Sequence, residues 1–122
     1  MTFDKDHNGR LGPHEFKEAQ LMLAGKKEVA FFYSDYPDEY LHDIKKYIEN
    51  GKFESFQMEA DNGLIVWTPG AKEKAARLAE LVRYGRQHGY VESVEREIGQ
   101  ILGYSEADID FYIHHIKSNL KK

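Results

Sequence analysis

The stretch 52–68 constrains the fold most, because two β-prone runs flank an Asn-Gly turn. The runs are "KFESFQME" (52–59) and "LIVWT" (64–68), and "ADNG" separates them. An Asn-Gly pair between such runs is a strong hairpin signal, with the glycine at positive φ. The run "EVAFFYS" (28–34) has the same aromatic and β-branched character. We therefore predict a small three-stranded sheet, with Gly63 in the turn between its second and third strands.

Helical patterns fill most of the remaining chain. Apolar residues recur at helical spacing, and prolines or glycines stand where these patterns begin or end. They predict helices over 13–24, 37–50, 71–88, 91–103 and 105–122. In the first of them, the periodicity predicts that Phe16, Ala19, Gln20 and Leu23 share one face. In the helix over 71–88, it predicts one face made by Ala75, Leu78, Ala79, Val82 and Arg83 or Arg86.

The order of these elements predicts an α+β fold in which helices pack on a small sheet and the C-terminal part is helical. A chain of 122 residues, 41% of them hydrophobic, can bury one core of moderate size. We expect a single domain over 1–122. It would consist of an α-β-α-β-β part (13–70) and three C-terminal helices (71–122).

Composition excludes several classes of function. The chain has no cysteine, so it has no disulfide, no thiolate zinc site and no thiol nucleophile. Its formal charge is −4 and no basic block stands out, so we expect no nucleic-acid partner. No apolar run is long enough to span a bilayer, and no signal peptide is visible, which together predict a cytoplasmic protein without a membrane partner.

The N-terminal segment "DKDHNGRLGPHE" carries the sharpest chemical signal. Oxygen-bearing side chains alternate at its start, a glycine comes next, and a glutamate closes it at the twelfth position. This spacing resembles the calcium loop of the EF-hand family, and the resemblance covers about residues 3–25. It implies a site made by the side chains of Asp4, Asp6, Asn8 and Glu15 together with the backbone carbonyl of Arg10.

The resemblance also implies limits on that site. Only Met1, Thr2 and Phe3 stand before the loop where the family has an entering helix, and the chain holds no second loop of this kind. Calcium as a cofactor would therefore be bound weakly, with a dissociation constant on the order of 10⁻⁴ M or poorer. The alternative is a tight turn at "HNG" and then an ordinary helix start at "LGPHEF".

The stretch 96–113 resembles a helix-turn-helix, with Gly99 at the helix crossing and Gly103 in the turn. Leu102, Ile109 and Tyr112 would fill the core between the two helices. A DNA reader would place the start of its second helix near phosphates and base edges. That start carries Glu106, Asp108 and Asp110. Their charge favours a structural corner or a protein-binding surface over a DNA contact.

Other candidate sites are weaker. Glu39 and His42, at spacing i, i+3, form a single metal-ligand pair, and Asp110 with His114 and His115 forms another small patch. A solvated helix face explains both. The aromatic and acidic stretch 33–40 fits either a binding surface or tyrosines that pack under the next helix.

No nucleophile with a base, phosphate loop or carboxylate pair is recognisable, so the sequence favours a non-enzymatic protein. The first hypothesis is a small soluble domain with a solitary calcium loop that acts through contacts with a protein partner. The second is a calcium-independent adaptor or regulator that uses the acidic aromatic surface and the C-terminal helices. An enzyme with an unrecognised site is the third.

Overall fold

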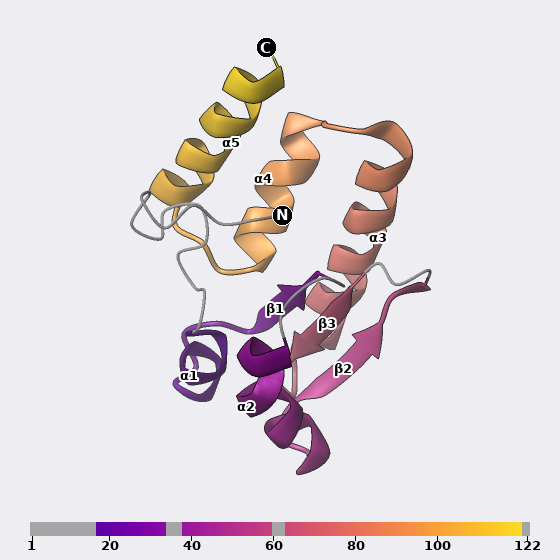
Figure 1. Cartoon of the computed structure of the whole chain (residues 1–122), viewed down its shortest axis with the longest axis vertical. Coiled ribbons are helices and arrows are strands. Elements are labelled where there is room, and N and C mark those ends of the chain that lie inside the picture. Colours follow the sequence, from indigo (N-terminus) through magenta and orange to yellow (C-terminus); the bar gives the residue numbers. More distant parts are fainter. Residues whose placement is uncertain (1–16, 34–37, 60–62, 121–122) are drawn as a thin grey trace.

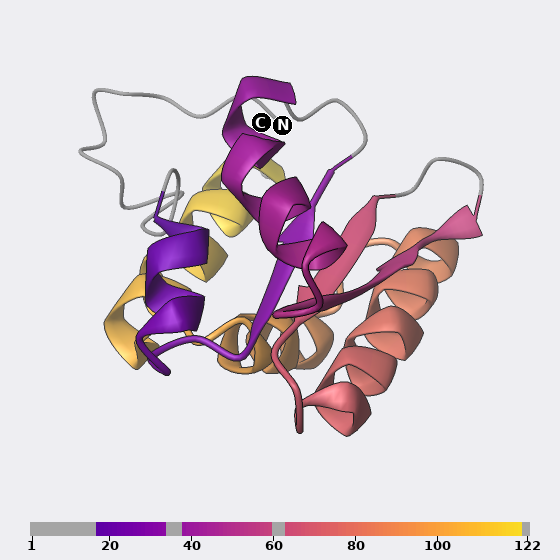
Figure 2. The same ribbon diagram turned by 90° about the horizontal axis from the view of Figure 1, so that it is seen from below.

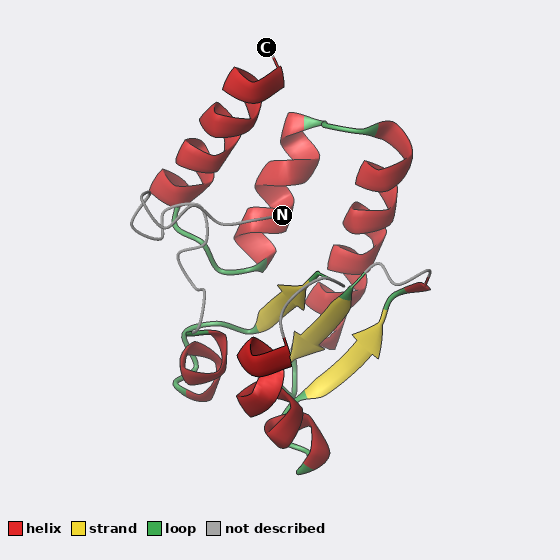
Figure 3. Ribbon diagram, in the orientation of Figure 1, coloured by secondary structure: helices red, strands yellow, loops and turns green. Residues whose placement is uncertain are grey.

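The computed structural model of the protein describes residues 17–33, 38–59 and 63–120 (Figure 1). Helices and strands alternate in its first half, and the second half is helical (Figure 3). The elements are α1 (Glu18–Leu23), β1 (Val29–Phe32), α2 (Asp38–Glu49), β2 (Glu54–Gln57), β3 (Leu64–Trp67), α3 (Lys72–His88), α4 (Glu92–Ile101) and α5 (Glu106–Leu120). This arrangement confirms the predicted α+β fold and the predicted order of its elements.

The three strands form one antiparallel sheet in the order β1-β3-β2. β3 lies in the middle and pairs with both neighbours, so that Ile65 faces Phe31 on one side and Phe56 on the other. Each strand is shorter than its predicted run. Gly63 has φ +123° and accepts a hydrogen bond of 2.8 Å from the backbone N–H of Met58, which confirms its place at the end of the hairpin turn.

Alternating side chains of the sheet enter two separate apolar clusters. Ala30, Phe32 and Val66 face α1 and α2, where they pack with Met22, Leu41, Ile44 and Phe53. Val29, Ile65 and Trp67 face α3 and the end of α4, where they pack with Met58, Ala71, Ala75, Leu78, Ala79 and Leu102. Figure 2 shows α2 and α3 on opposite faces of the sheet. The period of two along each strand therefore produces a three-layered core.

The C-terminal helices stand side by side in the order α3, α4, α5 (Figure 1). Ala75, Leu78 and Ala79 of α3 are buried against the sheet, as their spacing predicts. Leu81, which lies outside that predicted stripe, is also buried. At the far end of α3, Gly89 has φ +76° and its N–H bonds to the carbonyl of Gly85 at 2.8 Å, which ends the helix where predicted.

Helix α1 departs from the sequence prediction. It begins at Glu18, with Lys17 as its N-cap, whereas the pattern predicted a start at Pro13; residues 13–16 lie outside the described part of the chain. Its buried residue is Met22, which is 3% exposed, while Leu23 is 45% exposed. The predicted inward face is therefore wrong for Leu23, because the short helix presents the Met22 side to α2 and the sheet.

None of the helices among the described residues combines the length and the apolar character that crossing a membrane requires.

Candidate functional site

The predicted calcium loop lies outside the described residues. This holds for all five of its proposed ligands, Asp4, Asp6, Asn8, Arg10 and Glu15. The described residues begin at 17, just after the loop, and the first element among them is α1, which starts at Glu18. Met22 fixes this helix in the cluster between the sheet and α2. The segment that carries the calcium pattern is thus joined, within a few residues, to a helix that packs on the core.

Among the residues that the structure describes, the secondary metal candidates do not form a group of three ligands. Within 17–33, 38–59 and 63–120, no three His, Cys, Asp or Glu side chains lie together as metal ligands would. His42 is exposed, and the side chain of Glu39 is outside the described part. Asp110 accepts a 2.7 Å hydrogen bond from Nη1 of Arg96, which gives its carboxylate a structural role.

Lys27 is a residue whose role the sequence pattern did not reveal. It is only 2% exposed, although the pattern placed it after the glycine that ends the first helix. Its Nζ donates a hydrogen bond to the backbone carbonyl of Leu102, at the end of α4. The same nitrogen lies 5.0 Å from the centroid of the Tyr104 ring, within reach of a cation–π interaction. Lys27 therefore joins the segment before β1 to the α4–α5 corner.

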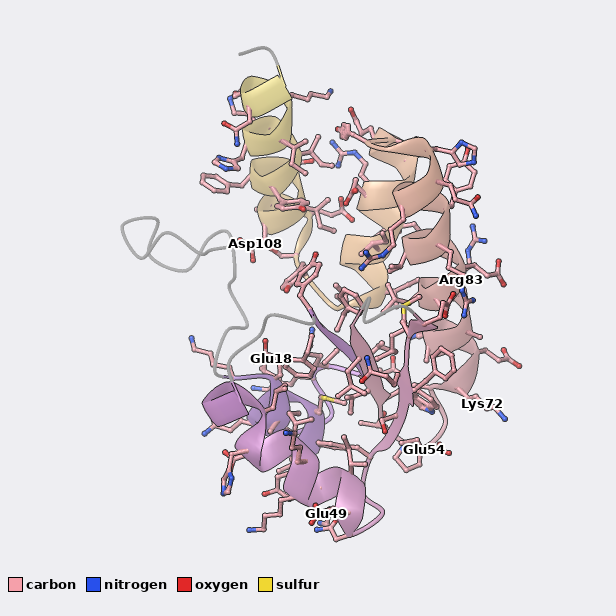
Figure 4. All side chains as sticks on the ribbon, turned by 45° about the vertical axis from the view of Figure 1, so that its right-hand side comes forward. Glu18, Glu49, Glu54, Lys72, Arg83 and Asp108 are labelled. Atoms are coloured by element: carbon pink, nitrogen blue, oxygen red, sulfur yellow. The ribbon has the colours of Figure 1, made fainter. Side chains whose placement is uncertain are left out.

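Burial is the main cause of the pKa shifts at this contact. It lowers the pKa of Lys27 from 10.5 to about 8, and the carboxylate of Glu18 partly opposes that change. Burial also raises the pKa of Tyr104, with smaller contributions from Glu18 and Asp108. Figure 4 shows Glu18 on α1 and Asp108 at the start of α5, on the same side of the molecule. The sequence held one signal of this role. Lys27 lies two residues before Val29, and in an extended chain two such side chains lie on the same side, here the side of α4.

The α4–α5 corner has the packing that its sequence predicts. A Cβ atom at Gly99 would lie 2.8 Å from Cγ1 of Ile109, so the two helices cross closely at this glycine. Gly103 has φ +83° in the turn. The backbone N–H of Asp108 donates to Oγ of Ser105 at 3.1 Å, so Ser105 caps the start of α5, at the residue where the predicted helix begins. Leu102 and Ile109 are buried here, whereas Tyr112 is only half-buried.

The start of α5 is acidic and open to solvent, since Glu106 and Asp110 are both exposed. Gln100 and Arg96 of α4 hydrogen-bond to these two carboxylates. A surface of this kind would repel phosphates. It supports the structural interpretation of the corner.

The acidic aromatic stretch is described only at its beginning. Tyr33 is 39% exposed, and its ring meets that of Phe31 edge-on with centroids 4.9 Å apart. This end of β1 is therefore partly exposed to solvent. The side chains of residues 34–40 lie outside the described part of the chain.

Comparisons with protein-family models, with curated proteins and with solved structures find no match to this chain.

Proposed function

We propose that the protein is a small calcium-binding domain whose loop over residues 4–15 holds one ion weakly, and that it acts through contacts with a protein partner. The observation that carries this proposal is the twelve-residue pattern itself. It combines acidic or amide oxygens at alternate positions, a glycine at the sixth position and a glutamate at the twelfth. Calcium takes six to eight oxygen ligands, and this spacing supplies them from one short segment.

The surroundings support a structural or modulatory use of the ion. Calcium would draw the loop into one conformation next to α1, which Met22 anchors in the core. Two partly exposed apolar side chains, Leu23 of α1 and Tyr33 at the end of β1, offer area for a protein contact. Binding of the ion in the loop would then influence a contact surface without any change in the fold.

Calorimetric titration of calcium tests the proposal. The unmodified protein should bind one ion, and Glu15→Gln should weaken that binding at least about tenfold because it removes the bidentate closing ligand. Glu28→Gln is the matched control: it removes the same charge from an exposed side chain paired with Lys74 at 2.5 Å. Equal affinities of the two variants would contradict the proposal, since the loss would then reflect net charge alone.

A calcium-independent adaptor is the second candidate, and the exposure of Leu23 and Tyr33 favours it equally. The discriminating experiment is recovery of a partner from extract in calcium and in chelator. An adaptor of this kind would be recovered equally in both conditions, and Leu23→Ser combined with Tyr33→Ser would abolish recovery. The calcium-dependent proposal requires a difference between the two conditions.

A further inference from the structure

Helices α4 and α5 form an antiparallel seam whose contacts keep one register. Gly99 meets Ile109 near the turn. Farther along, Arg96 pairs with Asp110 at 2.7 Å. Near the open end, Nζ of Lys117 lies 2.5 Å from a carboxylate oxygen of Glu92. The two ends of the seam are therefore held by tight packing at one side and by ion pairs at the other.

Glu95 occupies the middle of this seam, between Glu92 and Gly99 on the helix face that meets α5. It is half-buried, and burial raises the pKa of its carboxyl group. Helical spacing from Glu92, which contacts Lys117, and from Gly99, which contacts Ile109, puts Glu95 on the face of α4 that meets α5. Burial is the main cause of the raised pKa of Tyr112 on α5, and the charge of Glu95 adds to it. Within the described residues, its carboxylate has no hydrogen bond or ion pair. A carboxylate in this position weakens a seam that an apolar residue would stabilise.

A second polar group in the same region is also unsatisfied. The hydroxyl of Tyr90, in the connection between α3 and α4, is buried without a hydrogen-bond partner among the described residues. It also influences Tyr112 and Lys117 electrostatically. Buried polar groups without partners are rare in folded proteins, and each one costs stability. The seam is therefore less stable than its ion pairs alone suggest.

Helix α5 depends on this seam for its attachment. Among the described elements, its main neighbour is α4, and α4 also packs on α3 (Figure 1). Among the described side chains of α5, Ile109 and Ile113 are the buried apolar ones. Elements with few buried contacts open at a lower free energy than the core does. Opening of the seam would release α5 and leave the sheet and α3 intact.

We propose that α5 opens as a unit, separately from the core, and that ionisation of Glu95 in the seam promotes this opening. The carboxylate is better solvated in the open state, so its ionised form favours opening and its protonated form favours closure. The group contributes most to closure at low pH, and this contribution is lost as the pH rises through the pKa of Glu95 in the closed state.

Other groups at the seam act alongside Glu95. The ion pairs of Arg96 with Asp110 and of Lys117 with Glu92 favour closure near neutral pH, so they oppose its effect. Lys117 and Arg96 hold the pKa of Glu92 below its ordinary value. Tyr33, Tyr90, Tyr104 and Tyr112 are the nearby phenols, and burial raises the pKa of both Tyr104 and Tyr112. The closing equilibrium of α5 therefore depends on pH through several groups with opposite effects. A substitution at Glu95 isolates the contribution of Glu95.

Native-state amide hydrogen exchange tests the proposal on the full chain. The amide of Ile113 reports on α5 and that of Val66 reports on the central strand. In the unmodified protein, Ile113 should exchange through an opening that is more frequent than that of Val66. At pH 7, Glu95→Gln should slow exchange at Ile113 by at least about threefold relative to Val66. Near pH 4 this difference should shrink, because the carboxyl of the unmodified protein is then largely protonated.

Glu97→Gln is the matched control on the same helix. Glu97 accepts two hydrogen bonds from Arg77 of α3, at 2.7 and 3.0 Å, so its loss weakens the α3–α4 contact instead. It should not slow exchange at Ile113. Glu95→Met, which also removes the charge, should slow it as Glu95→Gln does. Equal opening at Ile113 and Val66 would overturn the proposal, as would unchanged exchange in both Glu95 variants at pH 7.

Discussion

Replacement of Gly99 by alanine tests the close crossing of α4 and α5. The new Cβ would lie 2.8 Å from Cγ1 and 3.1 Å from Cδ1 of Ile109. Ile109 is 3% exposed, and its Cγ1 is attached directly to the branched Cβ, so it has little room to move aside. The two helices must separate slightly or Ile109 must change its rotamer.

Two opposing effects set the magnitude. Alanine in place of glycine within a helix stabilises it by about 1 kcal/mol. Overpacking a buried contact costs about 1–3 kcal/mol. Since the contact involves a constrained atom, we expect a net loss of about 1 kcal/mol in the free energy of unfolding. Gly85→Ala in α3 is the control, because a Cβ there meets nothing within 4 Å and only the gain should remain.

Urea unfolding monitored by circular dichroism measures both effects. Ile109→Ala alone should cost about 2–5 kcal/mol, as removal of a buried isoleucine usually does. Combined with Gly99→Ala, it should cost less than the sum of the two single losses by about 2 kcal/mol, because the clash is then absent and the helical gain of alanine remains. If Gly99→Ala stabilises the protein as much as Gly85→Ala, the close crossing does not exist as described.

Three further perturbations give distinct results. Between pH 8 and 10 the unfolded chain holds a proton on Lys27 that the folded chain releases, so the free energy of unfolding should rise by about 2 kcal/mol; urea titrations of Lys27→Met should lack this rise. Gly63→Ala should lower the free energy of unfolding by about 2 kcal/mol or more, and with it the thermal midpoint, because its φ is +123° and a Cβ would lie 2.7 Å from the Phe31 ring; Gly70→Ala, with φ +96° and open space, should cost less. Trp67→Phe should cost about 1 kcal/mol in urea unfolding through loss of the 3.1 Å hydrogen bond from Nε1 to Glu54.

The sequence predicted those parts of the fold that local chemistry determines. The Asn-Gly turn, the β-prone run at 64–68 and the glycines at 89 and 103 all act through neighbouring residues, so the hairpin and the helix ends could be inferred. The crossing at Gly99 could also be inferred, because only a small residue allows close approach of two helices joined by a short turn.

Features that depend on distant contacts were missed. Lys27 comes after a glycine in a polar stretch. The folded chain brings its Nζ into hydrogen-bonding contact with the carbonyl of Leu102, which is 75 residues later in the chain. Leu81 lies off the predicted stripe of α3 but is buried. In α1, the helix is too short for its periodicity to distinguish Met22 from Leu23 as the inward residue. The calcium loop is a local pattern, and it stays a prediction.

Calcium titration monitored by amide chemical shifts tests the central proposal most directly. Gly9 stands at the sixth position of the loop, where the chain must turn sharply for the oxygens to converge on the ion. We predict a saturable shift of the Gly9 amide at calcium concentrations up to about millimolar, with no comparable shift in Glu15→Gln. A Gly9 signal that does not move at millimolar calcium would contradict the proposed function.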